Sequence, residues 1–303
     1  MPNVDGNALA KDYAVGVPFK GSGRFHVRGM NDVDWGMKDR LSRIFRPQSG
    51  KTIMLAFDHG YIMGSTTGLE RLDLNIPPLI DYVDVLMGTR GAIRAAVPPN
   101  SNKPIALRCS AGSTVLDEDM SLEYIGVDIE DAIRMNASLM AVQVFIGSPH
   151  EAQNIKNLVE TVDAGNRYSI PVLGVCAVGK QMERNERYFL LATRVIAELG
   201  AHVIKTYYCE PGFDRIVAAL PVPVVIAGGK KIPERDAIEL AWKAIDCGAA
   251  GVDMGRNIFQ AEDPIALLKA INAIVHEGER ADQAWQLYLE EKGRSGSAAK
   301  KER

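Results

Sequence analysis

The chain has 303 residues, of which 47% are hydrophobic, and 35 Lys and Arg against 38 Asp and Glu give a formal net charge of −3. Nothing in this balance suggests a nucleic-acid-binding surface, so we expect neither nucleic acid nor an anionic membrane as a partner. No apolar run approaches membrane length, and no signal peptide is visible. Without an export signal or metal-ligand spacing, we expect the cysteines to be free thiols in a reducing cytoplasm. They are Cys109, Cys176, Cys209 and Cys247.

Residues 1–30 are rich in glycine and lack periodicity, which predicts an irregular extension that wraps the domain or contacts a neighbouring subunit. Residues 35–45 then show apolar side chains at helical spacing. From residue 51, apolar runs with β-branched residues alternate with amphipathic stretches. The predicted strands span 52–57, 84–87, 105–108, 141–146, 172–177, 203–208, 222–227 and 251–254. The predicted helices span 69–82, 91–96, 128–136, 150–168, 185–199, 213–219, 233–247 and 264–276.

This alternation predicts an α/β fold. Near-continuous apolar strands are typical of a parallel sheet covered by helices. Eight strand–helix units favour closure into a (β/α)₈ TIM barrel over an open sheet, and no dinucleotide-binding glycine motif follows the first strand. We therefore predict a single barrel domain over 31–291, which includes an extra C-terminal helix over 281–291. The basic tail 292–303 is expected to be disordered, because its composition cannot bury a core.

Lys205 lies in the middle of the predicted strand 203–208. Strand geometry places Val203, Lys205 and Tyr207 on one face. Burial of an ammonium favours its neutral form, which is the nucleophile that a Schiff-base enzyme requires. A lysine that extends from a strand end into solvent is the alternative interpretation.

Two glycine turns follow the last two predicted strands, where barrel enzymes often bind a phosphate. The first contains Gly228, Gly229 and Lys230, and the second contains Gly255 and Arg256. Glycine lets backbone N–H groups approach the anion, and an arginine supplies a forked, charged contact. Two ordinary turns would be the structural alternative, but the pair predicts a phosphate site.

Asp58 and His59 follow the first predicted strand, at the end of the barrel where active sites lie. Asp58 could hydrogen-bond a substrate hydroxyl or the amine of Lys205, and His59 could transfer protons near neutral pH. The same turn could simply cap a helix. A nucleophilic cysteine, Cys109 or Cys176, is a rival hypothesis, although free cysteines usually behave as small buried hydrophobes. No three-ligand metal cluster is visible.

Several segments resemble the class I DeoC/archaeal fructose-bisphosphate aldolase family, in register from about Arg43 to His276. They are Leu55-Ala56-Phe57-Asp58-His59-Gly60, the lysine strand, Gly228-Gly229-Lys230-Lys231 and Gly255-Arg256-Asn257-Ile258-Phe259-Gln260. The resemblance implies a (β/α)₈ barrel, a Schiff-base lysine at Lys205 and a phosphate site in the two glycine turns. It also implies a homo-oligomer, a decamer, and no bound cofactor.

One departure is informative. Aldolases of this family carry Trp-Ser-Tyr-Pro-Arg-Gly after the fifth strand, whose tyrosine transfers a proton. Here the run is Val175-Cys176-Ala177-Val178-Gly179-Lys180. The chain is similar to the family's thiolase branch, which acts in autoinducer-2 degradation and quorum sensing. That similarity implies coenzyme A as co-substrate and conversion of 3-hydroxy-5-phosphonooxypentane-2,4-dione to acetyl-CoA and dihydroxyacetone phosphate.

Two alternatives stay open at this point. The first is a class I aldolase that uses the same lysine on fructose bisphosphate or a related sugar phosphate. The second is a sugar-phosphate-binding sensor without catalysis. Borohydride trapping separates an enzyme from a sensor, because reduction of a Schiff base adds mass to the lysine.

Overall fold

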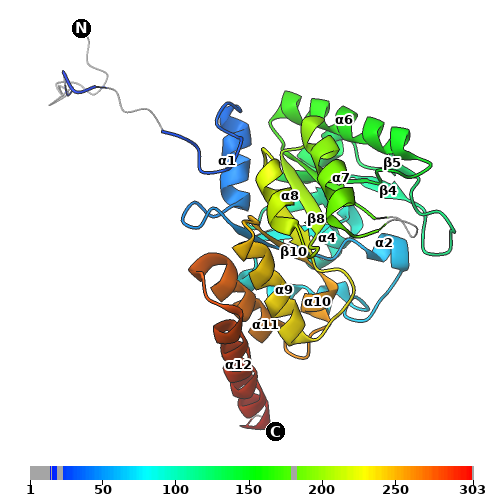
Figure 1. The fold of residues 1–303 in the computed structure, drawn as a ribbon. Coiled ribbons are helices and arrows are strands. Elements are labelled where there is room, and N and C mark those ends of the chain that lie inside the picture. Colours follow the sequence, from blue (N-terminus) through cyan, green and yellow to red (C-terminus); the bar gives the residue numbers. More distant parts are fainter. Residues whose placement is uncertain (1–13, 15, 19–22, 179–182, 302–303) are drawn as a thin grey trace, which may run out of the picture.

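The computed structural model describes residues 14, 16–18, 23–178 and 183–301, with backbone alone for 296–301. Its centre is a closed barrel of parallel strands surrounded by helices (Figure 1). The eight strands follow the order β1-β10-β9-β8-β7-β6-β3-β2. The predicted fold class is confirmed. The barrel strands are β1 (Thr52–Ala56), β2 (Val85–Gly88), β3 (Ile105–Arg108), β6 (Leu139–Val144), β7 (Val172–Cys176), β8 (Val203–Tyr207), β9 (Val224–Ala227) and β10 (Gly251–Met254).

Helices surround the barrel, and a short antiparallel hairpin, β4 (Ser110–Gly112) with β5 (Glu123–Ile125), follows β3. The sequence did not predict this hairpin. The α-helices are α1 (Trp35–Ile44), α2 (Gly60–Met63), α3 (Leu72–Asn75), α4 (Arg90–Ala96), α5 (Ile129–Arg134), α6 (Glu151–Tyr168), α7 (Glu186–Glu198), α8 (Phe213–Ala219), α9 (Glu234–Asp246), α10 (Arg256–Phe259), α11 (Pro264–Asn272) and α12 (Ala281–Lys301).

Side-chain caps fix where several of these helices begin. Asp34 accepts a hydrogen bond from the N–H of Met37 at the start of α1, and Asn185 accepts one from the N–H of Tyr188 at the start of α7. Asp263 caps α11, whose first residue is Pro264. Such caps satisfy N–H groups that have no partner within the helix, and proline fits the first helical turn because it has no N–H. Each capped helix therefore starts within a residue of its predicted position.

The predicted helix over 69–82 is wrong in its continuity. The structure has α3, followed by the 3₁₀ helix η1 (Pro77–Tyr82). Two consecutive prolines, Pro77 and Pro78, remove the N–H groups that would continue an α-helix through this segment. Similarly, α11 passes into a π-helical turn, η2 (Ala273–Glu277), which ends at Gly278 with φ of 79°.

The expectation that 292–303 is disordered is also wrong as far as Lys301, because α12 continues to that residue and projects from the barrel (Figure 1). Ion pairs support its middle part: Lys292 Nζ lies 2.5 Å from Glu262 Oε2, and Glu291 pairs with both Lys269 and Arg294. Composition alone missed these helix-stabilising contacts.

Residues 23–30 of the N-terminal extension contact the barrel through two buried side chains, whereas residues 14 and 16–18 are exposed. Val27 and Met30 are buried. Between them, the Arg28 guanidinium donates to the carbonyl of Val217 at 2.9 Å, at the end of α8. No helix within the described ranges is both long enough and apolar enough to cross a membrane.

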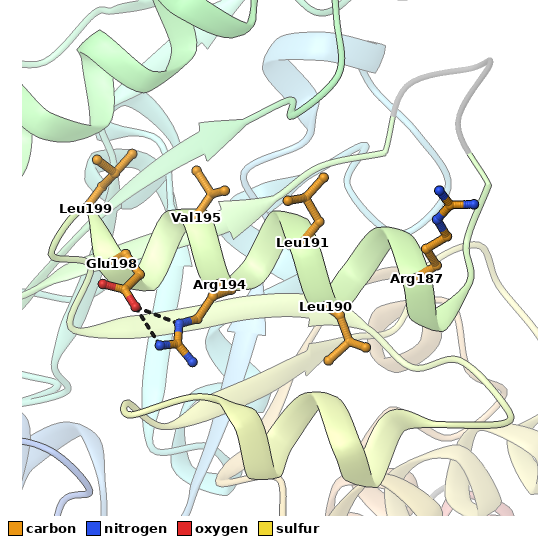
Figure 2. Close-up of a pocket in the computed structure, with 7 residues that line it drawn as sticks. All are labelled: Arg187, Leu190, Leu191, Arg194, Val195, Glu198 and Leu199. Atoms are coloured by element: carbon orange, nitrogen blue, oxygen red, sulfur yellow. Dashed lines mark hydrogen bonds and ion pairs between the residues drawn. The ribbon is translucent and has the colours of Figure 1, made fainter.

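The outer face of α7 carries an apolar groove with a volume of about 560 Å³. Figure 2 shows aliphatic side chains along this helix, with charged side chains among them. Leu191 is 60% exposed to solvent. The lining residues are Arg187, Leu190, Leu191, Arg194, Val195, Glu198 and Leu199. Exposed apolar area of this kind is typical of a surface that another molecule covers.

A buried ionic cluster centred on Asp84 closes the end of the barrel away from the glycine turns. Asp84 accepts hydrogen bonds from Arg46 Nε at 2.5 Å, the Ile53 N–H at 2.7 Å and His276 Nε2 at 2.9 Å. Burial alone would raise the pKa of Asp84, but the His276 and Ile53 hydrogen bonds hold it below the ordinary value. This cluster ties β1, the residue before β2 and η2 together.

Replacing Asp84 with asparagine is expected to destabilise the protein by about 1–3 kcal/mol at pH 7, since Arg46 loses its carboxylate partner and one of the two acceptor oxygens becomes a donor. A carboxyl group with a depressed folded pKa contributes stability above its unfolded pKa of about 3.9 and loses it as pH falls through the folded pKa. The difference between Asp84→Asn and the native protein in urea unfolding should therefore shrink below about pH 4. Asp73→Asn, which removes an exposed ion pair with Arg71, is the control and should change stability little.

Candidate active site

Lys205 points into the barrel from β8 and is 8% exposed. Its Nζ lies 2.9 Å from Oδ2 of Asp253 on β10 and 3.6 Å from Sδ of Met87 on β2. The order of strands places β9 between β8 and β10, so the side chain crosses the barrel interior to reach these two partners. The alternative of a lysine extended into solvent is excluded. The amine is a buried group with a carboxyl group beside it.

Asp253 is 1% exposed, and within the described part of the chain neither of its oxygens accepts a hydrogen bond of good geometry. Its Oδ2 is nevertheless within ion-pair distance of the Lys205 amine. Burial raises the pKa of Asp253, the nearby Lys205 charge opposes this, and the charge of Asp58 adds to the increase. A carboxyl group with these surroundings can exchange a proton with the amine.

Asp58 is 7% exposed and does not stand alone. The guanidinium of Arg108, at the end of β3, donates to Asp58 Oδ2 at 3.2 Å and to both oxygens of Glu123 at 3.0 and 3.1 Å. Arg108 Nη2 also donates to the Tyr61 hydroxyl, and Gln143 Nε2 donates to Glu123 at 3.0 Å. The Arg108 guanidinium lies between the two carboxyl groups and fixes the direction of Asp58.

His59 follows Asp58, and its ring stacks on Phe259 with centroids 5.4 Å apart. Burial lowers the pKa of His59; the Asp58 charge raises it, while the positive charges of Arg256 and Lys205 lower it further. The ring is therefore neutral near pH 7. Its buried Nε2 has no hydrogen-bond partner among the residues described, which leaves it able to accept or donate one proton.

The two glycine turns lie side by side because one side chain joins them. Nδ2 of Asn257 donates to the carbonyl of Gly228 at 2.7 Å, and its Oδ1 accepts from the N–H of Ile232 at 2.9 Å. Asn257 is completely buried. A Cβ on Gly255 would lie 2.1 Å from the carbonyl oxygen of Ala56, and Gly229 has φ of +72°, so both positions require glycine.

The two predicted cations of this region differ in position. Arg256 is half-buried beside the second turn, and its charge acts on His59. Within the described residues, its guanidinium has no ion pair or hydrogen bond. Lys230 is exposed, whereas the next residue, Lys231, pairs with Glu234 at 2.9 Å. Arg256 is the better placed of the two cations to hold an anion at the turns.

The end of β7 has no proton-donating side chain at Ala177, which is 7% exposed. The Tyr188 hydroxyl on α7 donates to the carbonyls of Ala177 and Ile146, both at 3.0 Å. Its proton is therefore engaged in hydrogen bonds to the backbone. Gly179 and Lys180, which complete the compared run, lie outside the described residues. Among the described residues of this strand end, Val175 to Val178, no side chain carries a hydroxyl group that could donate a proton as the family's tyrosine does.

The cysteine hypothesis is not supported. All four thiols are free, and three of them are buried. Burial raises the pKa of Cys109 and of Cys176 to about 12 in each case, so both are thiols at neutral pH. In the described part of the chain, no group of three His, Cys, Asp or Glu residues could hold a metal ion.

Sequence reasoning missed Asp253, Arg108 and Asn257 as members of the site. Each stands at the carboxyl end of a barrel strand or directly after it, which is the available signal. A charged residue inside an otherwise apolar strand end, such as Asp253 after Val252, indicates a buried partner. The identity of that partner depends on which strands are neighbours.

A closed (β/α)₈ barrel with a buried strand lysine, a carboxyl partner and two glycine turns at one end defines the class of Schiff-base aldolases. The model of the DeoC/LacD family aldolases matches residues 52–261. The chain belongs to this family.

The chain is 56% identical over 292 residues, 96% of this chain and 100% of the relative, to a protein of Pasteurella multocida named an uncharacterized aldolase. It is 55% identical over 293 residues, 97% of this chain and 100% of the relative, to a 3-hydroxy-5-phosphonooxypentane-2,4-dione thiolase of Yersinia enterocolitica. Among solved structures, a Schiff-base-forming fructose-1,6-bisphosphate aldolase superposes with a TM-score of 0.71 at 25% identity, over 79% of this chain and 99% of that one. The chain is an enzyme of this family, and its barrel contains the buried Lys205.

Proposed function

We propose that this enzyme transfers the acetyl group of 3-hydroxy-5-phosphonooxypentane-2,4-dione to coenzyme A, with acetyl-CoA and dihydroxyacetone phosphate as products, in autoinducer-2 degradation. The observation that carries the proposal is the buried pair of Lys205 and Asp253, 2.9 Å apart, in a chain highly similar to a thiolase of that name. Such a pair provides a nucleophilic amine together with the group that takes its proton.

The first step requires Lys205 to become neutral. Asp253 accepts its proton, and the amine attacks the C4 ketone, which is the carbonyl next to the phosphorylated carbon. Loss of water then leaves an iminium at C4. The amine must attack C4 because the bond that breaks is C2–C3. The electron pair of this bond remains on C3, and an iminium can accept it only at the neighbouring carbon C4.

In the second step the thiolate of coenzyme A adds to the C2 carbonyl. The C2–C3 bond breaks, the acetyl group leaves as acetyl-CoA, and the electron pair moves into the C4 iminium to form an enamine. A proton, equivalent to the one lost by the thiol, adds to C3. Water then hydrolyses the imine, which releases dihydroxyacetone phosphate and the lysine. His59, neutral and lacking a described partner at Nε2, can carry the proton for C3.

The glycine turns are proposed to hold the phosphate through the N–H groups of Gly229 and Gly255, with Arg256 beside them and Lys230 at the rim. Binding energy from the phosphate, which does not react, would position C4 at the amine. Asp58, directed by Arg108, would orient the hydroxyl on C3. Asn257 supports this arrangement because it keeps the two turns at a fixed separation.

Cleavage of fructose bisphosphate is the second candidate, favoured by the structural similarity to the Schiff-base-forming fructose-1,6-bisphosphate aldolase. Against it stands Ala177, which offers no proton where that family's tyrosine does.

The test is turnover of the phosphorylated dione with and without coenzyme A, measured as acetyl-CoA and as dihydroxyacetone phosphate. We expect both products in equal amounts and only when coenzyme A is present. Formation of dihydroxyacetone phosphate at the same rate without coenzyme A, or faster turnover of fructose bisphosphate, would contradict the proposal.

We further propose a homo-oligomer, a decamer, located in the cytoplasm. The apolar groove on α7 supports an interface between copies, since aliphatic area of this kind is covered in oligomers (Figure 2). The four free thiols favour a reducing compartment.

A further inference from the structure

A second cavity opens beside Asp58, on the side of the barrel that faces α3 and α4. Its volume is about 550 Å³. The ends of β1 and β2 form its inner wall, with Phe57, Asp58 and Thr89. Its outer walls are the segment from α2 to α3, including Ser65, and the face of α4 that carries Ala95. The proposed phosphate site does not use this cavity.

The order of strands places the Lys205 amine between the glycine turns and this cavity. Lys205 contacts β10 through Asp253 and β2 through Met87, and β1 is hydrogen-bonded between those two strands. The inner wall of the cavity continues directly from β1 as Phe57 and Asp58. The glycine turns follow β9 and β10, on the opposite side of β1. A ligand anchored at the turns and bound to the amine therefore directs its far end toward the cavity.

We propose that this cavity receives the pantetheine arm of coenzyme A, an inference that rests on the proposed function. In the phosphorylated dione, the acetyl group is the end farthest from the phosphate. With phosphate at the glycine turns and C4 at Lys205, the acetyl carbonyl faces Asp58 and the cavity. The thiolate that attacks this carbonyl must approach from the same side, because the β9 and β10 side is taken by the phosphate.

The lining fits a thin, uncharged arm with amide groups. Apolar side chains of Leu69, Leu72 and Ala92 alternate with hydroxyl groups of Ser65 and Thr89. Pockets of this composition bind through apolar contact and use a few polar groups for direction.

The charges at the cavity disfavour the nucleotide end of coenzyme A. Among its lining residues the only cation is Arg71, which is paired with Asp73 by two hydrogen bonds at 2.8 and 2.5 Å. Of the three carboxylates that line it, Asp58 is paired with Arg108 and Asp73 with Arg71, so no lining cation is left to bind a phosphate group, and Glu70 adds a negative charge. The nucleotide therefore stays outside the mouth, and pantetheine alone occupies the cavity.

Two substitutions fill the cavity from opposite walls. Ala95→Trp acts from α4 and Ser65→Trp from the segment before α3, and both side chains are exposed in the native protein. Each is expected to raise the KM for coenzyme A by about tenfold or more and to leave the KM for the phosphorylated dione unchanged, because only acceptor binding is obstructed. Ala218→Trp, at an exposed alanine on α8, is the matched control and should change neither constant.

Borohydride trapping of Lys205 with dihydroxyacetone phosphate is measured on all variants and reports the lysine and phosphate site without coenzyme A. The contrary result is that both tryptophan variants trap Lys205 to the native extent, form acetyl-CoA at the native rate and keep the native KM for coenzyme A. That result would overturn the assignment of the cavity and leave the proposed function standing. An increase in the KM for the dione instead would also overturn it. Absence of acetyl-CoA formation by the native enzyme would overturn the proposed function itself.

Discussion

Lys205→Met is expected to reduce turnover of the phosphorylated dione by a factor on the order of 10⁴ or more, as removal of a catalytic nucleophile does. Methionine fills a similar volume but has no amine, so neither the iminium nor the enamine can form. Borohydride reduction in the presence of dihydroxyacetone phosphate should add the mass of the reduced adduct to the native protein and none to the variant.

The substitution also leaves Asp253 buried without its cation. Loss of one partner from a buried ion pair costs about 3–5 kcal/mol. The raised pKa of Asp253 reduces this penalty because the carboxyl group can take up a proton. Circular dichroism and urea unfolding therefore accompany the kinetics. Lys156→Met, at an exposed lysine paired with Glu160 on α6, is the control. Retained turnover in a folded Lys205→Met enzyme would refute the Schiff-base mechanism.

Asp253→Asn is expected to lower kcat/KM by about 10²–10⁴-fold, the usual contribution of a positioned acid–base group. The amide keeps the shape of the side chain and cannot take the proton from Lys205. The native enzyme should lose activity as pH falls through the raised pKa of Asp253, since the carboxyl group must be ionised to act as a base. The variant should lack this acid limb in its pH–rate profile.

The pH profile distinguishes a proton acceptor from a merely structural partner. If Asp253 only packed against the lysine, Asp253→Asn would lower the rate equally at every pH and keep the limb. Asp246→Asn, at an exposed carboxylate on α9, controls for the loss of one negative charge. An unchanged acid limb in a folded Asp253→Asn enzyme would remove Asp253 from the proton transfer.

Much of the architecture could be predicted from sequence because barrel strands are short, apolar and regularly separated. Ile105–Arg108, Gly251–Met254 and α8 have the predicted bounds, and the other barrel strands differ by one or two residues at their ends. Helix breaks were harder to predict, since the pattern of apolar residues runs through Pro77 and Pro78 although their rings cannot continue the helix.

The site was predictable where it depends on local sequence and not where it depends on neighbouring strands. Lys205 and the glycine turns can be recognised in single segments. The pairing of Lys205 with Asp253 joins residues 48 positions apart on strands that are not adjacent in the barrel. Likewise, Arg108 connects Asp58 with Glu123 from a hairpin that sequence analysis did not anticipate. Such contacts become predictable only when the order of the strands in the closed barrel is known.

The ring is completed where β10 pairs with β1, joining Thr52 with Gly251 and Leu55 with Met254. Asp253 therefore lies on β10, the last strand in the sequence, whose pairing with β1 closes the barrel. A nascent polypeptide released before residue 251 would contain a lysine without its acceptor and one glycine turn without the other. The proton acceptor of Lys205 and the second glycine turn are thus added to the site in one step, when β10 pairs with β1. Enzyme activity is therefore a measure of whether β10 has joined the barrel.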